Sequence, residues 1–236
     1  MTIIKTYQFN DWNQIQSLNW YVTVNGNSIA LKSPYNLHRC NLCWDIYPSM
    51  LNDIISFYHD KLFYLHNVYP IDSSYLWFEG KIFEMELTIH NLKQREQKNN
   101  NITINTKNIC LWSKIFTSAT NLRHKIFFLF IKEFAKLPHI NFFILYSHNI
   151  PVATSMLNIY NDNAVISSVA VLNQFRDQGF GKTIILDTIN YAYKLGVENI
   201  YIYSMEQFCD LYKSLGFNII EMLYLYKKNV NANKRI

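Results

Sequence analysis

The chain has 236 residues, of which half are apolar and 16% aromatic. This composition is typical of a globular protein with a sizeable core and excludes a disordered chain. Its 22 basic and 17 acidic residues give a formal charge of +5, which is too mild to predict a nucleic-acid partner. The length accommodates one large domain or two small ones.

The sequence contains no recognisable targeting signal. Residues 1–12 lack the charged start and apolar run of a secretory signal. The most apolar run, residues 126–131, is far shorter than the roughly 20 residues that span a bilayer. Four cysteines are too few and too scattered for a disulfide framework: Cys40, Cys43, Cys110 and Cys209. We therefore expect a cytoplasmic protein without a membrane partner.

In chain order, the first predicted element is a hairpin of Tyr21–Val24 and Ser28–Leu31 around an Asn-Gly turn. A helix is predicted to begin at Pro48 and to continue for about four turns, because apolar residues recur at helical spacing: Leu51, Ile54, Ile55, Tyr58, Leu62 and Leu65. Two strands, Tyr75–Phe78 and Lys81–Ile89, are expected on either side of a Glu-Gly pair.

One cluster in this half resembles part of a metal site. His38, Cys40 and Cys43 include a Cys-x-x-Cys pair, which is half of a common zinc site. No second pair of Cys or His follows at a suitable spacing. Ordinary buried thiols are therefore the preferred interpretation, and no metal is expected.

The second half begins after a polar, Asn-rich segment, residues 90–108, which is predicted to be a linker containing a short strand at Ile102–Ile104. The tail from Lys228 is expected to fray. Between them we expect two helices, a hairpin, a strand, a helix, a strand, a helix and a final strand or pair of strands: Leu111–Ala119, Ile126–Leu137, Phe142–Tyr146 with Val152–Tyr160, Val165–Val171, Lys182–Leu195, Asn199–Met205, Glu206–Leu215 and Phe217–Lys227.

Glycine is concentrated in one stretch. The chain has 6 glycines, and 4 of them lie in residues 169–217. Gly196 and Gly216 follow predicted helices and are expected to cap them. Gly179 and Gly181 lie between a strand and a helix start, where unpaired N–H groups and the helix dipole favour an anion.

Three glycine-loop motifs compete for this segment. A P-loop requires glycine where Arg176 stands, and a dinucleotide fingerprint requires it where Ile184 stands. The remaining pattern, Arg176-x-x-Gly179-x-Gly181, resembles the pyrophosphate loop of the GNAT superfamily of acyl-CoA-dependent N-acetyltransferases. The segment LYKSLGF at residues 211–217 resembles the LYxxLGF signature of the same superfamily, and the order of predicted elements matches its fold.

The resemblance covers roughly the C-terminal half. It implies an α/β (α+β) fold with a mixed, mostly antiparallel sheet, helices on both faces, and a splay where the cofactor enters. We expect an acetyltransferase domain over residues 100–228, an N-terminal domain over 1–95 and a frayed tail over 229–236. The N-terminal half lacks a pyrophosphate loop, so it is either a degenerate second copy of the fold or a domain that packs beside it.

The resemblance also implies how acetyl-CoA is held. Backbone N–H groups of the loop would bind the pyrophosphate, from Gln178, Gly179, Phe180, Gly181 and Lys182. The preceding strand would bind the pantetheine arm through the backbone of Val169 and Val171. Arg176 either adds charge to this site or buttresses the loop, and Asp177, an acid beside the anion, must point away.

Tyr212 matches the family's tyrosine near the thioester sulfur. It is either the acid that protonates the thiolate, which a phenol of ordinary pKa can do, or a core aromatic residue. Where the family often has Asn, seven positions earlier, this chain has Met205 beside Ser204.

No general base identifies itself. The strand before the loop offers Ser167 and Ser168 but no carboxylate. Glu133, Glu206 and His148 are candidates that better suit the surface, and a chain of water molecules would also remove the proton.

The predicted function is transfer of an acetyl or other acyl group from acetyl-CoA to an amine of a small molecule, peptide or protein. The alternative is a catalytically inactive CoA-binding or protein-interaction module. The loop and Tyr212 favour the enzyme, whereas Met205 and the missing base favour the module. The sequence identifies neither the acceptor nor the oligomeric state.

Overall fold

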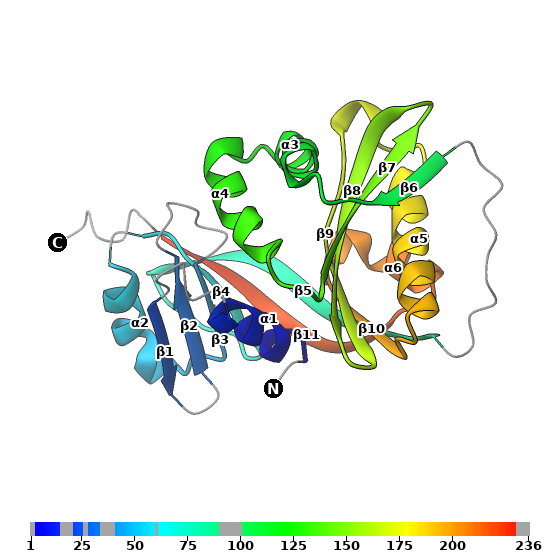
Figure 1. Ribbon diagram of the computed structural model, residues 1–236. Helices are drawn as coiled ribbons and strands as arrows, with labels where there is room; N and C mark the ends of the chain where they lie inside the picture. Colours follow the sequence, from blue (N-terminus) through cyan, green and yellow to red (C-terminus); the bar gives the residue numbers. More distant parts are fainter. Residues whose placement is uncertain are drawn as a thin grey trace. The chain divides into compact units, whose positions relative to one another are not determined.

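The computed structural model describes residues 3–14, 21–25, 28–33, 41–59, 61–89 and 101–229 (Figure 1). These residues form two compact units. The first contains the described residues of Met1–Glu84, Ser204–Cys209 and Ile219–Ile236, and the second contains those of Met85–Tyr203 and Asp210–Asn218. These units do not coincide with the domains expected from the sequence, because the final strand groups with the first unit. The division into functional domains at residues 95–100 stays a prediction.

The first unit contains helices α1 (Ile3–Gln14) and α2 (Leu51–Tyr58) and a sheet in the order β1-β2-β3-β4-β11-β5. Its strands are β1 (Tyr21–Asn25), β2 (Ser28–Lys32), β3 (Leu42–Trp44), β4 (Tyr64–Asn67), β11 (Asn218–Lys228) and the first part of β5 (Leu76–Thr88). The predicted hairpin is confirmed as the antiparallel pair β1–β2. Helix α1 was not anticipated from the sequence.

The predicted four-turn helix is wrong in its second half. After a 3₁₀ turn at Pro48–Met50, α2 ends at Tyr58, and His59 takes a left-handed φ of 50°. Leu65 belongs instead to β4, where burial alternates along the strand. Leu62 and Leu65 continue the helical period, but Leu65 also belongs to a period of two, because Phe63, Leu65 and Asn67 are buried at alternate positions.

The two strands predicted on either side of Glu79 form one strand of 13 residues, β5, so the predicted break between them is wrong. Gly80 lies inside it with φ of 144°. Glycine permits this conformation without ending the strand.

The core of the first unit is organised around Tyr58. This fully buried ring stacks on Phe63 with centroids 4.4 Å apart, and its hydroxyl lies 2.9 Å and 2.7 Å from the carbonyl oxygens of Leu31 and Leu42. The single side chain therefore joins α2 to β2 and β3.

The tail is ordered further than expected. Lys228 is the buried last residue of β11, and its ammonium donates to the carbonyl of His59. The backbone N–H of Asn229 donates to the carbonyl of Tyr75 at 2.8 Å. The expectation of fraying from Lys228 is thus wrong for these two residues, and residues 230–236 lie outside the described part of the chain.

The second unit has the sheet order β5-β10-β9-β8-β7-β6. Its strands are β6 (Asn101–Asn105), β7 (Ile140–Ser147), β8 (Ile150–Tyr160), β9 (Asn163–Val171) and β10 (Asn199–Met205), together with the end of β5. Its helices are α3 (Ile109–Thr120), α4 (His124–Phe134), α5 (Phe180–Lys194) and α6 (Cys209–Ser214). These elements confirm the predicted order, and β11 proves to be one strand rather than a pair.

Helices cover both faces of this sheet. Helices α3 and α5 both pack against β7, β8 and β9, from opposite sides (Figure 1). The sheet is antiparallel from β6 to β9, and β10 joins β9 in parallel. The predicted mixed, mostly antiparallel fold is therefore correct.

Residues from the N-terminal half complete the second unit. Met85, Leu87 and Ile89 are buried there, at 0%, 3% and 1% exposure. The N–H of Ile89 donates to the carbonyl of Glu198 at 2.8 Å, and the Tyr201 hydroxyl donates to Glu86 at 2.7 Å. The edge of this sheet beside β10 thus comes from β5. None of the described helices combines the length and apolar character needed to cross a membrane.

Candidate functional site

The glycine loop joins β9 to α5. A 3₁₀ turn at Asn173–Phe175 follows β9, and α5 begins directly after Gly179, whose φ is 82°. The first bond within the helix runs from the N–H of Thr183 to the carbonyl of Gly179, at 3.0 Å. The N–H groups of residues 180–182 precede that bond, so they point out of the positive end of the helix. This is the geometry of an anion-binding helix end.

The two glycines serve this end differently. Gly179 needs its left-handed backbone, which strains any residue with a side chain. Gly181 has no such φ, and an added Cβ would meet only Val171 Cγ2, at 3.7 Å, an ordinary contact. The fold itself would accept alanine at 181, so glycine is not needed there for folding. Its effect is to keep the space outside the helix end open.

Arg176 points away from this end. Its Nη2 donates to the carbonyl of Ala119, near the C-terminus of α3, at 2.9 Å. Of the two roles considered for Arg176, this contact favours the buttress. Asp177 is exposed with φ of 59°, and the Gln178 side chain donates back to the Gln174 carbonyl at 3.2 Å.

Two aromatic rings pack against each other across the loop. Phe175 and Phe180 meet edge to face with centroids 6.2 Å apart. This contact joins the 3₁₀ turn to the first residue of α5. Lys182 is exposed at the same helix end, where it adds a positive charge.

Strand β9 carries a bulge before the loop. The β8–β9 register shifts between Thr154 and Met156, opposite Ser168, which has φ of 53°. At this level the Trp112 indole N–H of α3 donates to the Ser155 carbonyl at 3.0 Å. Bulges of this kind interrupt pairing and increase local twist.

Beyond the bulge, β9 presents an open edge. Its parallel pairing with β10 runs only from Asn163 to Val165. The N–H of Leu172 donates towards β8, to Val152, at 3.0 Å. Because backbone groups alternate between the two edges of a strand, those of Val171 point to the edge that faces β10, and Val169 lies two residues earlier, next to the bulge.

These features fit an acyl-CoA. The helix end supplies N–H groups for a pyrophosphate, and the open edge of β9 supplies backbone donors and acceptors for the amides of a pantetheine arm. In addition, Ser167 Oγ on the same strand is buried and has no hydrogen-bond partner among the described residues. The individual cofactor contacts stay predictions.

Tyr212 lies in α6 and is buried, with 7% of its surface exposed. Its ring meets Phe217 edge to face at 5.7 Å. The helix ends at Ser214, and Gly216 follows two residues later with φ of 100°, where an added Cβ would lie 3.2 Å from Leu87. The signature therefore packs as a unit, and the role of the Tyr212 hydroxyl stays a prediction. Met205, where the family often has Asn, is exposed and offers no amide.

The structure identifies none of the three candidate bases as the general base. Glu133 of α4, expected at the surface, is 8% exposed and pairs with Lys136, which follows the helix. Glu206 is exposed at the start of a 3₁₀ turn. His148 occupies the β7–β8 turn, with φ of 49°, and its Nδ1 lies 3.2 Å from Ser147 Oγ.

Sequence reasoning overlooked His124. It begins α4, and its Nε2 lies 3.0 Å from Oγ of the fully buried Ser113, which donates to the Cys110 carbonyl at 3.0 Å. A lone histidine in an apolar helix gives no local signal of such a contact, because Ser113 lies in a different helix.

The cluster of His38, Cys40 and Cys43 is only partly described by the structure. His38 and Cys40 lie outside the described residues, and within those residues no group of His, Cys, Asp or Glu is arranged to hold a metal. Cys43 is buried, and both burial and the Asp45 carboxylate raise the pKa of its thiol.

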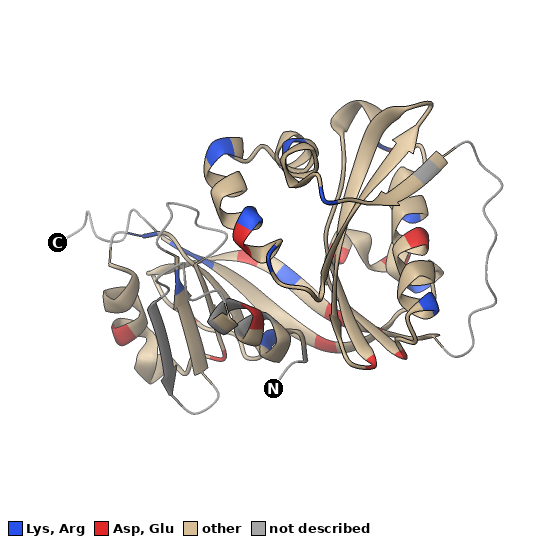
Figure 2. Ribbon diagram, in the orientation of Figure 1, with Lys and Arg blue, Asp and Glu red and all other residues tan. Residues whose placement is uncertain are grey.

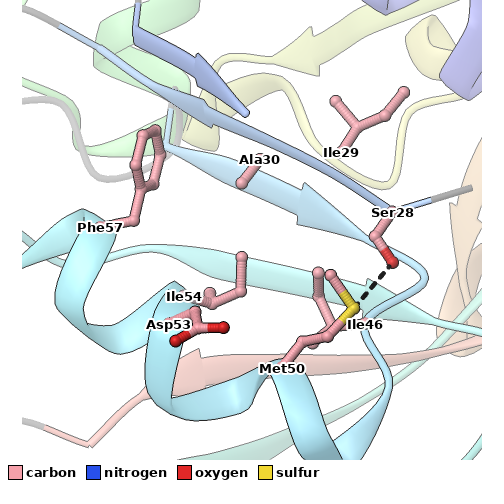
Figure 3. Close-up of a pocket in the computed structure, with 8 residues that line it drawn as sticks. All are labelled: Ser28, Ile29, Ala30, Ile46, Met50, Asp53, Ile54 and Phe57. Atoms are coloured by element: carbon pink, nitrogen blue, oxygen red, sulfur yellow. Dashed lines mark hydrogen bonds between the residues drawn. The ribbon is translucent and has the colours of Figure 1, made fainter. Parts of the chain in front are cut away.

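A pocket in the first unit was also not anticipated. It lies between β2 and α2 and has a volume of about 290 Å³ (Figure 3). Apolar side chains form most of its wall, and Asp53 contributes a carboxylate; the lining is Ser28, Ile29, Ala30, Ile46, Met50, Asp53, Ile54 and Phe57. Its volume is at the lower end of small-molecule sites, about 300–1,000 Å³.

Comparisons with known proteins agree with the geometry of the second unit. Residues 110–217 match the sequence model of the acetyltransferase (GNAT) family. No curated protein matches the chain in sequence.

Solved structures share the fold of nearly the whole chain. A GCN5-related N-acetyltransferase from Kribbella flavida aligns over 96% of this chain and 97% of its own, with a TM-score of 0.66 at 12% identity. A functionally unknown conserved protein from Staphylococcus epidermidis aligns over 89% and 94%, with a TM-score of 0.66 at 15% identity.

A tandem GNAT protein from the clavulanic acid biosynthesis pathway aligns over 85% and 81%, with a TM-score of 0.55 at 8% identity. Its likeness extends the GNAT-type fold beyond the matched segment and is consistent with an N-terminal extension of that kind. The sequence match and the shared fold agree that the C-terminal half of this chain, at residues 110–217, is a domain of the acetyltransferase (GNAT) family.

Proposed function

We propose that the chain transfers an acetyl group from acetyl-CoA to an amine of a small molecule, peptide or protein. The observation that carries this proposal is the N-terminus of α5. There Gly179, with φ of 82°, precedes N–H groups that lie ahead of the first helical hydrogen bond. An intact anion-binding loop at the family's cofactor position argues for continued use of the cofactor.

Each part of the site has a role in this proposal. The N–H groups of residues 178–182 bind the pyrophosphate, assisted by the helix dipole. The backbone of Val169 and Val171 orients the pantetheine arm along the open edge of β9. Arg176 holds the loop against α3 through Ala119.

The chemistry needs one bond to form and one to break. Acetyl-CoA supplies an activated acyl group as a thioester. The acceptor nitrogen forms a bond to the thioester carbon, the carbon–sulfur bond breaks, the nitrogen loses one proton and the thiolate gains one. The Tyr212 hydroxyl supplies the proton to the thiolate. Water removes the proton from the amine, since no side chain is assigned as base.

A catalytically inactive CoA-binding module is the second candidate. Two observations favour it: Met205 stands where the family often has Asn, and neither β8 nor β9 carries an ionisable carboxylate (Figure 2). Both strands also lack Lys and Arg, so the sheet beside the bulge is uncharged.

Two measurements separate these candidates. The first is the rise in melting temperature caused by CoA, and the second is thiol release from acetyl-CoA with a panel of amino acids, amino sugars, polyamines and peptides. Stabilisation with turnover on at least one amine supports the enzyme. Stabilisation without turnover on any amine supports the module, and the absence of both contradicts both candidates.

A further inference from the structure

Ser167 in β9 carries a hydroxyl that the described chain leaves unused. Its Oγ is buried, and no donor or acceptor among the described residues reaches it. A buried hydroxyl without a partner destabilises a fold, so such groups mark sites of strain or of a missing ligand.

Two neighbouring hydroxyls on β8 are engaged. Thr154 Oγ1 donates to the Ser168 carbonyl at 3.4 Å, and Ser155 Oγ bonds to Thr188 of α5 at 2.7 Å. Ser167 differs from both, although it lies on the adjacent strand at the same level. The difference is therefore specific to the position of Ser167 and not to the composition of the strands.

The position of Ser167 follows from the register. Because Ser155 bonds to α5, its side chain lies on the α5 face, and Met156 points to the opposite face, which α3 covers. Ser167 pairs with Met156 and so shares that face. It lies two residues past Val165, the last residue that pairs with β10, and is therefore beside the open edge of β9.

The hydroxyl can reach this edge without losing a bond. Ser167 as a residue is partly exposed although its Oγ is buried. A serine has three staggered positions about χ1, and a rotation breaks no hydrogen bond, because Ser167 Oγ makes none with the described residues. In a rotated position the hydroxyl can bond to a ligand that lies along the open edge of β9.

The distance along the strand suggests which part of a ligand it meets. Four residues separate Ser167 from Val171, which is about 13 Å at roughly 3.3 Å per residue. A pantetheine arm that starts at the loop and passes Val171 and Val169 brings its far end, the acyl group, towards Ser167. The neutral surroundings in β8 and β9 suit a neutral acceptor such as a carbonyl oxygen.

We propose that Ser167 Oγ donates a hydrogen bond to the acyl carbonyl oxygen of bound acyl-CoA and so distinguishes the acylated form from free CoA. This inference rests on the proposed function. The same bond holds the carbonyl in place for attack and stabilises the charge that develops on its oxygen. Ser167 is thereby a positioning residue for the acyl group.

The test compares the affinities for acetyl-CoA and for CoA, measured by calorimetry in the absence of an amine. Ser167→Ala should weaken acetyl-CoA binding by about two- to tenfold, the range for one neutral hydrogen bond, and leave CoA binding unchanged. Ser167→Thr keeps the hydroxyl and should restore the preference. Ser155→Ala is the matched control, because it removes a serine hydroxyl from the opposite face of the same bulge and should leave the ratio of the two affinities unchanged.

An unchanged ratio in Ser167→Ala overturns this inference and leaves the proposed function standing, provided that the wild-type protein binds both ligands. A wild-type protein that binds neither ligand overturns both. An equal loss of both affinities in Ser167→Ala also overturns the inference, because it indicates a general structural defect.

Discussion

At the scale of single residues, Tyr212 has two roles, one for its ring in packing and one proposed for its hydroxyl in catalysis. Its ring packs against Phe217 in the core of the second unit, and its hydroxyl is the proposed acid. Substitution by phenylalanine separates these roles, because the ring and its packing remain while the proton donor is lost.

We expect Tyr212→Phe to lower turnover by roughly 10²–10⁴-fold, the range for loss of a positioned general acid, with little change in CoA affinity or melting temperature. The measurement is thiol release alongside a thermal melt on the same preparation. Tyr191→Phe is the matched control, because its hydroxyl lies 3.0 Å from Asn105 Nδ2 at the sheet edge and its loss should leave turnover intact. Normal turnover in a stable Tyr212→Phe protein removes Tyr212 from the mechanism.

His66 makes stability in the first unit sensitive to acid. It is half-buried and meets Trp44 with ring centroids 5.8 Å apart, and the loss of solvent around its imidazole lowers its pKa from 6.5 to about 4. The folded chain therefore resists protonation that the unfolded chain accepts. The stability from neutral His66 is complete above pH 6.5 and is lost as the pH falls from 6.5 towards 4.

We expect the free energy of unfolding to fall by up to about 3 kcal/mol across this range through His66. The His66→Gln protein should lack this part of the pH dependence, whatever its offset at pH 7.5. Urea unfolding at several pH values measures both slopes. Parallel curves for the two proteins would contradict the assignment.

At the scale of elements, the start of α5 has one glycine that the fold requires and a second that leaves room for a ligand. Gly179 is required by its backbone conformation, whereas Gly181 is free of that requirement and leaves open space outside the helix. The two positions should therefore fail in different ways when substituted.

We expect Gly181→Glu to fold normally but to lose the rise in melting temperature that CoA causes, because its side chain occupies the anion position with a negative charge. Gly181→Ala is the matched control and should fold with the wild-type stability. Gly179→Ala should lower the free energy of unfolding by about 1–2 kcal/mol through backbone strain. Full stabilisation of Gly181→Glu by CoA would show that the loop does not bind the pyrophosphate.

At the scale of the whole molecule, the two halves of the sequence are not independent. Strand β5 begins in the first compact unit and ends in the second, where Met85, Leu87 and Ile89 are buried beside β10. The C-terminal half therefore needs residues that precede its matched segment to complete its sheet.

We expect the fragment of residues 100–236 to be insoluble or unstable, because it exposes the edge of β10 and the apolar surface that Leu87 covers. In the full chain, Leu87→Ala should lower the free energy of unfolding by about 2–5 kcal/mol, whereas Thr88→Ala, at an exposed neighbouring position, should change it by less than about 0.5 kcal/mol. A soluble fragment with unchanged CoA binding would contradict this dependence.

Local patterns determined much of the second unit from the sequence alone. Helical periods, strand runs and the glycine positions predicted the order from β6 to β10, the glycine loop and the cap at Gly216, because each depends on residues a few positions apart. The anion-binding character of the loop follows from the same local geometry.

Only the tertiary structure decided the features that depend on distant partners. Leu65 follows the periods of both a helix and a strand, and pairing with β3 and β11 makes it part of a strand. The contact of Arg176 with Ala119 spans 57 positions of sequence. Ser167 stands out only once Ser168 and Thr188 have supplied partners to Thr154 and Ser155, since an unmet hydrogen bond is a property of the completed packing and not of the residue.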